Sequence, residues 1–368
     1  MRAKHSVLIG LLMLTLVLPS PPTMSQTNIN AEAWLAKAQL PPPFDPGQSK
    51  AGWEKKRFKI RKELWDLLGK LPARPKAPKV EMLSREDKGE FVVEKFQFDN
   101  QAGAVVPGYI LLPKKASTKS PAILYCHWHG GEYEIGKEEL FQSKHTPELP
   151  GPTLAKRGYV VLGVDAYCFG ERNGHGPGTE RGRDGEMTAS KFNLWVGRTL
   201  WGMILRDDLM ALDYLASRKE VDPKRIGAIG MSMGATRAWW LMALDDRLKT
   251  GVPICCLTRY QNLIQRDLLK AHGIYYFVPN VLNHFDTEAI VALIAPRPVL
   301  FLDGDQDGTS PVDGIRAIEA AVRPVYRLYG REKAFQSIVY AGQGHLYTPG
   351  MWQRTLDWLD EKLEYSEK

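Results

Sequence analysis

The chain has 368 residues, of which 44% are hydrophobic and 25% charged, and its formal net charge is +7 at pH 7. This composition excludes disordered, collagen-like and disulfide-dense proteins and suits a globular protein with one large core. A cluster of basic residues lies between Lys55 and Lys62, among apolar residues at helical spacing. No nucleic-acid-binding motif accompanies this cluster, so we expect no nucleic-acid partner.

The first 25 residues have the layout of a secretory signal peptide. Arg2 and Lys4 precede an apolar run from Val7 to Leu18, and small residues follow at positions 23 and 25. The run is shorter than the roughly 20 residues that span a bilayer, which favours a cleaved signal over an uncleaved membrane anchor. We therefore expect a secreted or periplasmic protein with no membrane association beyond export.

The next part of the chain divides into three segments. Residues 26–52 are rich in proline and are interpreted as a linker, and residues 53–71 as an amphipathic helix packed on the body. The body is one domain over residues 75–368. It opens with two expected strands, at 90–98 and 105–112, and Pro107 with Gly108 places the second at a sheet edge or a bulge.

From residue 121 onward, short continuous apolar runs alternate with helical segments. Such runs are typical of parallel strands that are buried on both faces. The runs lie at 123–125, 160–162, 226–229 and 299–302. The alternation predicts an α/β fold with a mostly parallel central sheet and helices on both faces. Residues 258–296 interrupt the alternation and are either plain packing or the wall of a pocket.

The central motif is Gly230-Met231-Ser232-Met233-Gly234, between an apolar run and a helical segment. A strand, a sharp turn and a helix in this order hold a nucleophilic serine above a sheet, with glycines where the backbone passes close to its neighbours. We therefore predict Ser232 as a nucleophile. The N–H of Met233, at the start of the helix, is expected to donate to an oxyanion.

A serine hydroxyl needs a base, which is itself oriented by an acid. His345 follows a glycine-rich loop near the end of the chain and is the predicted base. Asp307 lies in the turn after the run at 299–302 and is the predicted acid, with Asp305 and then Asp303 as the alternatives.

The segment from His127 to Gly131 follows the strand at 123–125 and is expected to supply a second oxyanion donor, from the backbone of Gly130 or Gly131. His127 and His129 are alternate residues that would share a face of a strand, which makes them candidate zinc ligands. Because no third ligand is near in sequence, we expect no metal, and the chemistry needs no cofactor.

Substrate contacts are expected from Trp128, Tyr167 and Arg172, which follow two expected strands at the end where ligands bind. The alternative for the two aromatic residues is core packing, and for Arg172 an ion pair with a neighbouring acid. Cys126 and Cys168 either form a disulfide or are small buried side chains.

The elbow at 230–234, Asp307, His345 and the His129-Gly130-Gly131 loop together resemble the α/β-hydrolase superfamily, over about residues 80–365. Residues 221–226 and 294–298 resemble its dienelactone hydrolase, acetyl xylan esterase and prolyl-oligopeptidase-like branch. The resemblance implies the same triad and oxyanion donors. Dienelactone hydrolases carry a cysteine nucleophile, so the serine here favours ordinary ester cleavage.

The expected function is therefore a serine esterase that cleaves a carboxylic ester through an acyl-enzyme. The expected substrate is a small molecule or a carbohydrate that carries an acetyl or other acyl ester. Two alternatives are a prolyl-oligopeptidase-like serine peptidase and a non-catalytic binding protein that retains the fold.

Overall fold

The computed structural model describes residues 31–38, 40, 42–114 and 119–363. The expected signal peptide, residues 1–25, lies outside this part of the chain. No helix among the described residues has the length and apolar character needed to cross a membrane.

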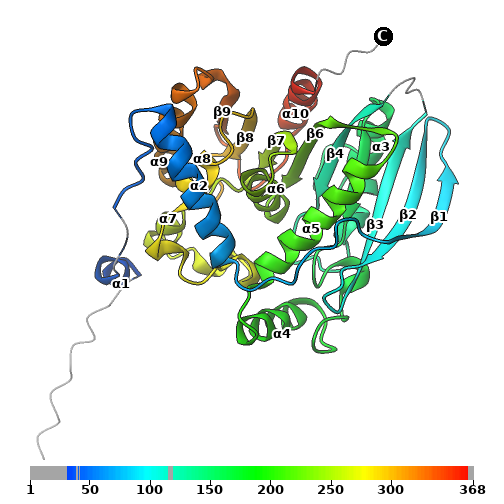
Figure 1. The fold of residues 1–368 in the computed structure, drawn as a ribbon, viewed down its shortest axis with the longest axis horizontal. Helices are drawn as coiled ribbons and strands as arrows, with labels where there is room; N and C mark the ends of the chain where they lie inside the picture. Colours follow the sequence, from blue (N-terminus) through cyan, green and yellow to red (C-terminus); the bar gives the residue numbers. More distant parts are fainter. Residues whose placement is uncertain (1–30, 39, 41, 115–118, 364–368) are drawn as a thin grey trace, which may run out of the picture.

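Nine strands of the described chain form one sheet (Figure 1), in the order β1-β2-β3-β5-β4-β6-β7-β8-β9. Their bounds are β1 Val80–Asp87, β2 Phe91–Asp99, β3 Val105–Pro113, β4 Ser120–Cys126, β5 Val160–Val164, β6 Val221–Met231, β7 Leu248–Ile254, β8 Val299–Gly304 and β9 Phe335–Tyr340. Strands β1 to β3 pair antiparallel, β3 joins β5 antiparallel, and all pairs from β5 to β9 are parallel. The predicted mostly parallel α/β sheet is confirmed.

Strand β3 lies inside the sheet, so its expected position at an edge is wrong. It pairs with β2 along its whole length and with β5 from Gly108 to Leu111. The pairing with β5 starts just after Pro107, whose missing N–H is therefore tolerated. Gly108 has a packing role, because a Cβ at this position would lie 2.4 Å from the ring of Phe96.

Helices cover both faces of the sheet, as Figure 1 shows. One core layer packs under α5, α6, α8 and α9, and the other under α3 and α10. The helix bounds are α1 Ala31–Lys37, α2 Lys50–Leu67, α3 Pro150–Lys156, α4 Gly182–Trp195, α5 Leu200–Ser217, α6 Met233–Leu244, α7 Tyr260–Gln265, α8 Thr287–Ala292, α9 Val312–Leu328 and α10 Pro349–Lys362. Short 3-10 turns include η1 Gly136–Phe141, η3 Leu269–Ala271, η4 Ile274–Tyr276 and η5 Val281–Asn283.

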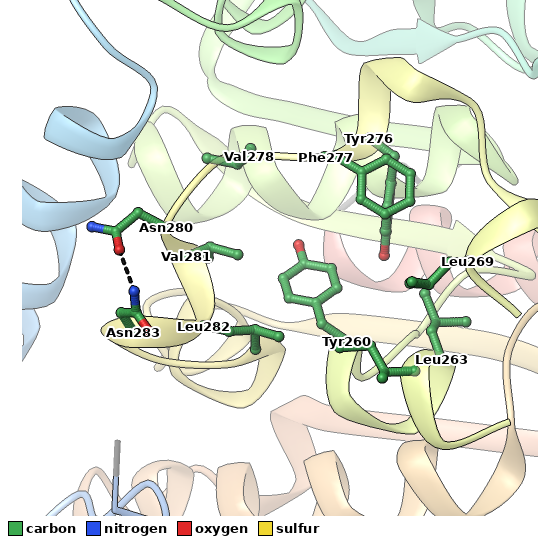
Figure 2. Close-up of a pocket in the computed structure, with 11 residues that line it drawn as sticks. Tyr260, Leu263, Leu269, Tyr276, Phe277, Val278, Asn280, Val281, Leu282 and Asn283 are labelled. Carbon is green, nitrogen blue, oxygen red and sulfur yellow. Dashed lines mark hydrogen bonds between the residues drawn. The ribbon is translucent and has the colours of Figure 1, made fainter. Parts of the chain in front are cut away.

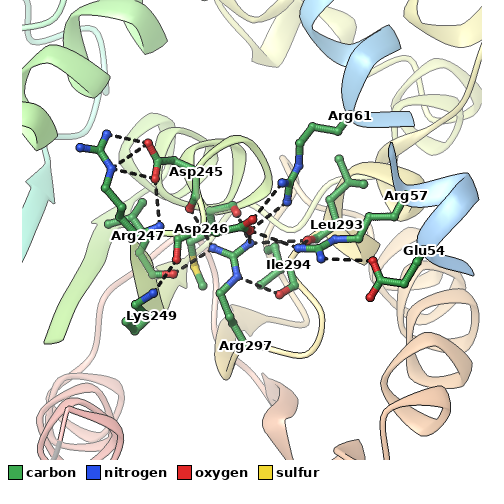
Figure 3. A network of polar contacts seen from close by, with 12 residues as sticks. Glu54, Arg57, Arg61, Asp245, Asp246, Arg247, Lys249, Leu293, Ile294 and Arg297 are labelled. Carbon is green, nitrogen blue, oxygen red and sulfur yellow. Dashed lines mark hydrogen bonds and ion pairs between the residues drawn. The ribbon is translucent and has the colours of Figure 1, made fainter. Parts of the chain in front are cut away.

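Helix α2 corresponds to the expected basic helix but runs from Lys50 to Leu67, and α1 lies within the segment that was interpreted as a linker. Trp53 and Leu64 of α2 are fully buried against the body. Its basic face also has a partner (Figure 3): the carboxylate of Asp246 lies 3.1 Å from Arg57 and 2.9 Å from Arg61. Because Asp246 is half exposed, buried apolar contacts stabilise the docked helix more than this cluster does.

All four cysteines have free, buried thiols, so Cys126 and Cys168 form no disulfide. Burial raises the pKa of each of these two thiols to about 12, which keeps them protonated near neutral pH. They are small core side chains, which was one of the two alternatives from the sequence.

Candidate active site

Ser232 lies at the tight junction between β6 and α6, with φ 57° and ψ −116°. A non-glycine residue rarely adopts this conformation, and the strain is typical of functional positions. The flanking glycines make the turn possible. A Cβ would lie 2.4 Å from the Cys126 carbonyl oxygen at Gly230 and 2.0 Å from it at Gly234. The elbow therefore rests directly on the end of β4.

His345 is in contact with Asp307, as the sequence predicts. The Nδ1 atom of His345 lies 2.7 Å from Oδ2 of Asp307. Thr309 donates to the other carboxylate oxygen from its N–H at 2.8 Å and from its hydroxyl at 2.7 Å. With Nδ1–H bonded to the carboxylate, Nε2 is left as the nitrogen that can accept a proton.

The environment of Asp307 keeps it ionised. Burial alone would raise the pKa of this carboxyl group, but the hydrogen bond and charge of His345 and the bonds from Thr309 hold the pKa below 3.8. An ionised acid stabilises the charged imidazolium that forms when His345 takes a proton.

The two alternative acids have other partners. Asp305 accepts a hydrogen bond from the N–H of Gly342 at 2.7 Å and is exposed. Asp303 is buried at the end of β8, where it accepts from the N–H of Leu257, and burial raises its pKa to about 7. Neither forms a hydrogen bond with His345 among the described residues.

Ser232 and His345 both line a cavity of about 590 Å³, at the edge where the parallel strands end. Its walls come from three elements that are far apart in the chain: the loop at 128–133, helix α4 and the segment at 270–275. The further lining residues are Trp128, His129, Gly130, Gly131, Tyr133, Arg183, Glu186, Met187, Cys256, Lys270, Ala271, His272, Gly273, Ile274, Tyr275 and Thr309. The region at 258–296, which interrupts the alternation of strands and helices, thus contributes a wall of the cavity.

The two glycines expected as oxyanion donors differ in their surroundings. The N–H of Gly131 donates to Nδ1 of His129 at 3.0 Å, so it is already used within the loop and Gly131 is corrected to a loop-holding role. Gly130 lines the cavity with φ 50°, and its N–H has no hydrogen bond among the described residues. Met233 opens α6, and the N–H groups of a first helical turn have no partner within the helix.

Two buried side chains hold this loop in place. His127 places Nδ1 2.8 Å from the Trp128 carbonyl oxygen, and its Nε2 accepts from the N–H of Ala166 at 3.0 Å. Burial keeps the pKa of His127 well below 6.5, so the ring is neutral and Nδ1–H is the donor. Glu139 of η1 accepts the N–H of Trp128 at 2.8 Å. The backbone on both sides of Trp128 is therefore fixed.

The described residues offer no ready metal site here. Both ring nitrogens of His127 and of His129 are bonded to protein groups. Donor atoms of Cys255, Asp307 and His345 lie within 4.8 Å of one another. However, Asp307 and His345 are bonded to each other, and burial raises the pKa of Cys255, which keeps its thiol protonated.

Of the three expected substrate contacts, the structure brings only Trp128 to the cavity. Arg172 is buried in an ion pair with Asp207 at 2.9 Å, and its guanidinium lies 3.8 Å from the ring centre of Tyr167. The Tyr167 hydroxyl accepts from Asn100 at 2.9 Å. Tyr167 and Arg172 are therefore corrected to parts of a buried polar network.

Several cavity residues were not foreseen. Glu186 of α4 accepts from Nε2 of His129 at 2.8 Å and from the hydroxyl of Tyr133 at 2.9 Å. No local pattern points to it. Thr309 was recognisable in principle, because a threonine two residues after an aspartate commonly bonds back to its carboxylate.

A model of the Abhydrolase family matches residues 32–323. YtaP of Bacillus subtilis (strain 168), which is named a hydrolase, is 40% identical over 294 residues, covering 79% of this chain and 95% of that protein. Two solved structures share the fold. One, a Bacteroides fragilis protein described as an acetyl xylan esterase, has a TM-score of 0.67 at 21% identity, covering 84% of this chain and 80% of that one. The other, a glucuronoyl esterase from Solibacter usitatus, has a TM-score of 0.66 at 18% identity, covering 89% of this chain and 99% of that one. The expected α/β-hydrolase fold is confirmed, and the chain belongs to the Abhydrolase family.

Proposed function

We propose that the protein is a serine esterase, in which Ser232, His345 and Asp307 cleave a carboxylic ester. One observation carries the proposal. A serine in a strained strand-to-helix turn shares a cavity with a histidine whose Nδ1 lies 2.7 Å from a buried, ionised carboxylate. Such a constellation is recognised by geometry and roles, and it suits nucleophilic acyl transfer.

The proposed reaction has two steps. The Ser232 hydroxyl attacks the ester carbonyl carbon while Nε2 of His345 takes its proton, and the tetrahedral intermediate breaks its bond to the alkoxy oxygen. His345 gives the proton to the departing alcohol. Water then attacks the acyl-enzyme with His345 as base, which releases the acid and restores the serine.

The oxyanion of each tetrahedral intermediate is proposed to accept from the N–H groups of Met233 and Gly130. Gly130 lines the Ser232 cavity, and Met233 follows Ser232 at the start of α6. The loop that carries Gly130 is fixed by Glu139 and His127 before any substrate arrives. Donors that need no rearrangement during the reaction give the largest stabilisation.

For the substrate we propose an ester on a carbohydrate, handled outside the cytoplasm if residues 1–25 act as a signal peptide. Aromatic rings of Trp128, Tyr133 and Tyr275 line the cavity, and such faces suit sugar rings. Arg183 and Lys270 also line it, and no carboxylate among the described residues pairs with either. These cations favour an acidic sugar, which is consistent with the likeness to a glucuronoyl esterase.

A peptidase on the same triad fits the cavity less well. An exopeptidase of this kind needs carboxylates that can receive the free amine of a peptide. Glu186 is the only acid among the described lining residues, and its carboxylate is already held by His129 and Tyr133.

The test compares hydrolysis of 4-nitrophenyl acetate and of a glucuronic acid methyl ester by the wild type and by Ser232→Ala, with Ser84→Ala as a matched control on exposed β1. We expect Ser232→Ala to lose at least about a thousandfold in kcat/KM, and the control to lose nothing. Equal activity of wild type and Ser232→Ala would refute the assignment. Cleavage of aminoacyl-nitroanilides without ester cleavage would favour the peptidase. If a fluorophosphonate fails to label Ser232, this result would favour the non-catalytic alternative.

A further inference from the structure

One buried carboxylate joins three separate walls of the cavity. The side chain of Glu186, on α4, is 3% exposed. Its Oε2 atom accepts from Nε2 of His129 at 2.8 Å and from the Tyr133 hydroxyl at 2.9 Å, both in the loop after β4. Its Oε1 atom accepts from the N–H of Tyr275, in η4, at 3.3 Å. Glu186 therefore ties both this loop and η4 to α4.

His129 connects Glu186 to the glycines of the loop. Nδ1 of His129 accepts from the N–H of Gly131 at 3.0 Å, so the ring proton lies on Nε2 and is donated to Glu186. The ring is bonded at both nitrogens, which fixes its orientation. Gly130, the proposed oxyanion donor, lies between His129 and Gly131 in the chain. The peptide that presents the Gly130 N–H is therefore held through His129.

The two glycines make this part of the loop adaptable unless side chains hold it. Gly130 and Gly131 have φ of 50° and 79°, a region that glycine enters freely. The buried side chains described above fix the loop at Trp128, before the glycines. The hydrogen bond between His129 and Glu186 is an anchor at the glycines themselves.

The segment at 270–275 is held by Glu186 for a different reason. The residues that flank it, Leu269 and Tyr276, line a second cavity of about 340 Å³ beside α7 (Figure 2), which shares no lining residue with the Ser232 cavity. This wall therefore has a cavity on each side, and backbone beside a cavity has fewer packing contacts to hold it in place. The hydrogen bond to Glu186 fixes the wall on the Ser232 side.

We propose that Glu186 is a positioning residue of the esterase reaction, which sets the place of the Gly130 N–H through His129. This inference rests on the proposed ester hydrolysis at Ser232. Glu186 takes no proton and touches no reacting atom, because three hydrogen bonds already occupy both of its carboxylate oxygens. Its effect belongs to the transition state, because the oxyanion forms only there and a misplaced donor stabilises it less.

The first test measures kcat and KM for 4-nitrophenyl acetate in Glu186→Ala and Glu186→Gln. We expect the alanine variant to lose about a hundredfold in kcat, the cost of a displacement of about 1 Å, with KM changed less than about threefold. The glutamine variant keeps an oxygen that can accept from His129 and Tyr133, so it should recover at least about tenfold of this loss. A KM that rises at constant kcat would place Glu186 in substrate binding and would overturn the proposal.

Glu94→Ala is the matched control for the loss of a buried carboxylate. Glu94 is 1% exposed on β2, lies 2.7 Å from Arg85 and 3.0 Å from Arg218, and does not line the Ser232 cavity. This variant should lower the melting temperature, as Glu186→Ala does, while its kcat stays unaltered. Equal losses of kcat in the two variants would show a general effect of destabilisation and would contradict positioning.

A double-mutant cycle tests the route through His129. In His129→Asn the side-chain oxygen can still accept from the N–H of Gly131, but the side chain is too short to reach Glu186. If Glu186 acts through His129, the double variant Glu186→Ala/His129→Asn loses no more kcat than the more damaging single change. Losses that multiply would overturn this route.

Circular dichroism of each variant verifies folding. If Glu186→Ala does not fold, Glu186→Gln and His129→Asn give the answer, and wild-type kcat in both overturns the proposal. A wild type that is inactive toward every ester would refute the proposed function and this inference with it. An active wild type whose kcat is kept in folded Glu186→Ala would refute the inference alone.

Discussion

Glu139 couples protonation to the stability of the loop beside Ser232. It is fully buried, accepts the Tyr125 hydroxyl at 2.6 Å and the Trp128 N–H at 2.8 Å, and burial raises its pKa from 4.5 to about 7. Between these two pH values the folded protein holds a proton that the unfolded chain has lost. The contribution to stability is therefore fully present below pH 4.5 and is lost as the pH rises through 7. A gap of about 2.5 pH units corresponds to about 3 kcal/mol.

Glu139→Gln tests this directly, because a glutamine matches the protonated acid in shape and cannot ionise. Urea denaturation of both proteins from pH 4.5 to 8.5 gives the free energy of unfolding, and the difference between them cancels the other titrating groups. We expect the wild type to lose up to about 3 kcal/mol relative to Glu139→Gln over this range, with most of the change between pH 4.5 and 7 and little above pH 7.5. A difference that stays constant with pH would refute the reasoning.

Three further predictions concern the triad and the docked helix. Asp307→Asn should lower kcat for nitrophenyl esters about ten-thousandfold with an unchanged circular dichroism spectrum, because the imidazole loses its orienting carboxylate; near-normal kcat would remove Asp307 from the triad. Thr309→Val should lower kcat about tenfold at constant KM, because Asp307 loses the hydrogen bond from the Thr309 hydroxyl and keeps only the one from the backbone N–H, and Thr309→Ser should restore kcat; equal losses in both variants would contradict a role for the hydroxyl. Trp53→Ala should lower the free energy of unfolding in urea by about 3–5 kcal/mol, the usual cost of emptying a buried tryptophan site; a loss below about 1 kcal/mol would show that α2 is not part of the cooperative fold.

The elbow and the His345–Asp307 contact were predictable because their signals are local. Gly230 and Gly234 flank the serine at the positions where a Cβ would strike the Cys126 carbonyl oxygen. Short apolar runs marked the parallel strands, and parallel strands bring all their carboxyl ends to one edge. Loops that follow different strands then meet there without any further information from the sequence.

Contacts between distant segments could not be predicted in this way. Glu186 of α4 forms a hydrogen bond with His129, and no sequence pattern in either segment predicts that the two residues are in contact. Arg172 was expected at the substrate because it follows β5, but Asp207 of the buried helix α5 offers it a carboxylate inside the core. Strand β3 was expected at an edge or a bulge from Pro107 and Gly108, and such local cues say nothing of where the pairing with β5 begins.

The segment at 269–276 separates the Ser232 cavity from the second cavity beside α7. Residues 270–275 line the Ser232 cavity, and Leu269 and Tyr276 line the second one. The rings of His272 and Tyr276 stack on each other across this wall. A bulkier or smaller side chain in this segment shifts the wall that the two cavities share. Such a mutation therefore changes the shape of both cavities. Substitutions in this segment therefore cannot change the substrate specificity of the Ser232 cavity without also changing the shape of the second cavity. Directed changes of substrate preference should start instead from Met187 or Arg183 on α4, which border the Ser232 side alone.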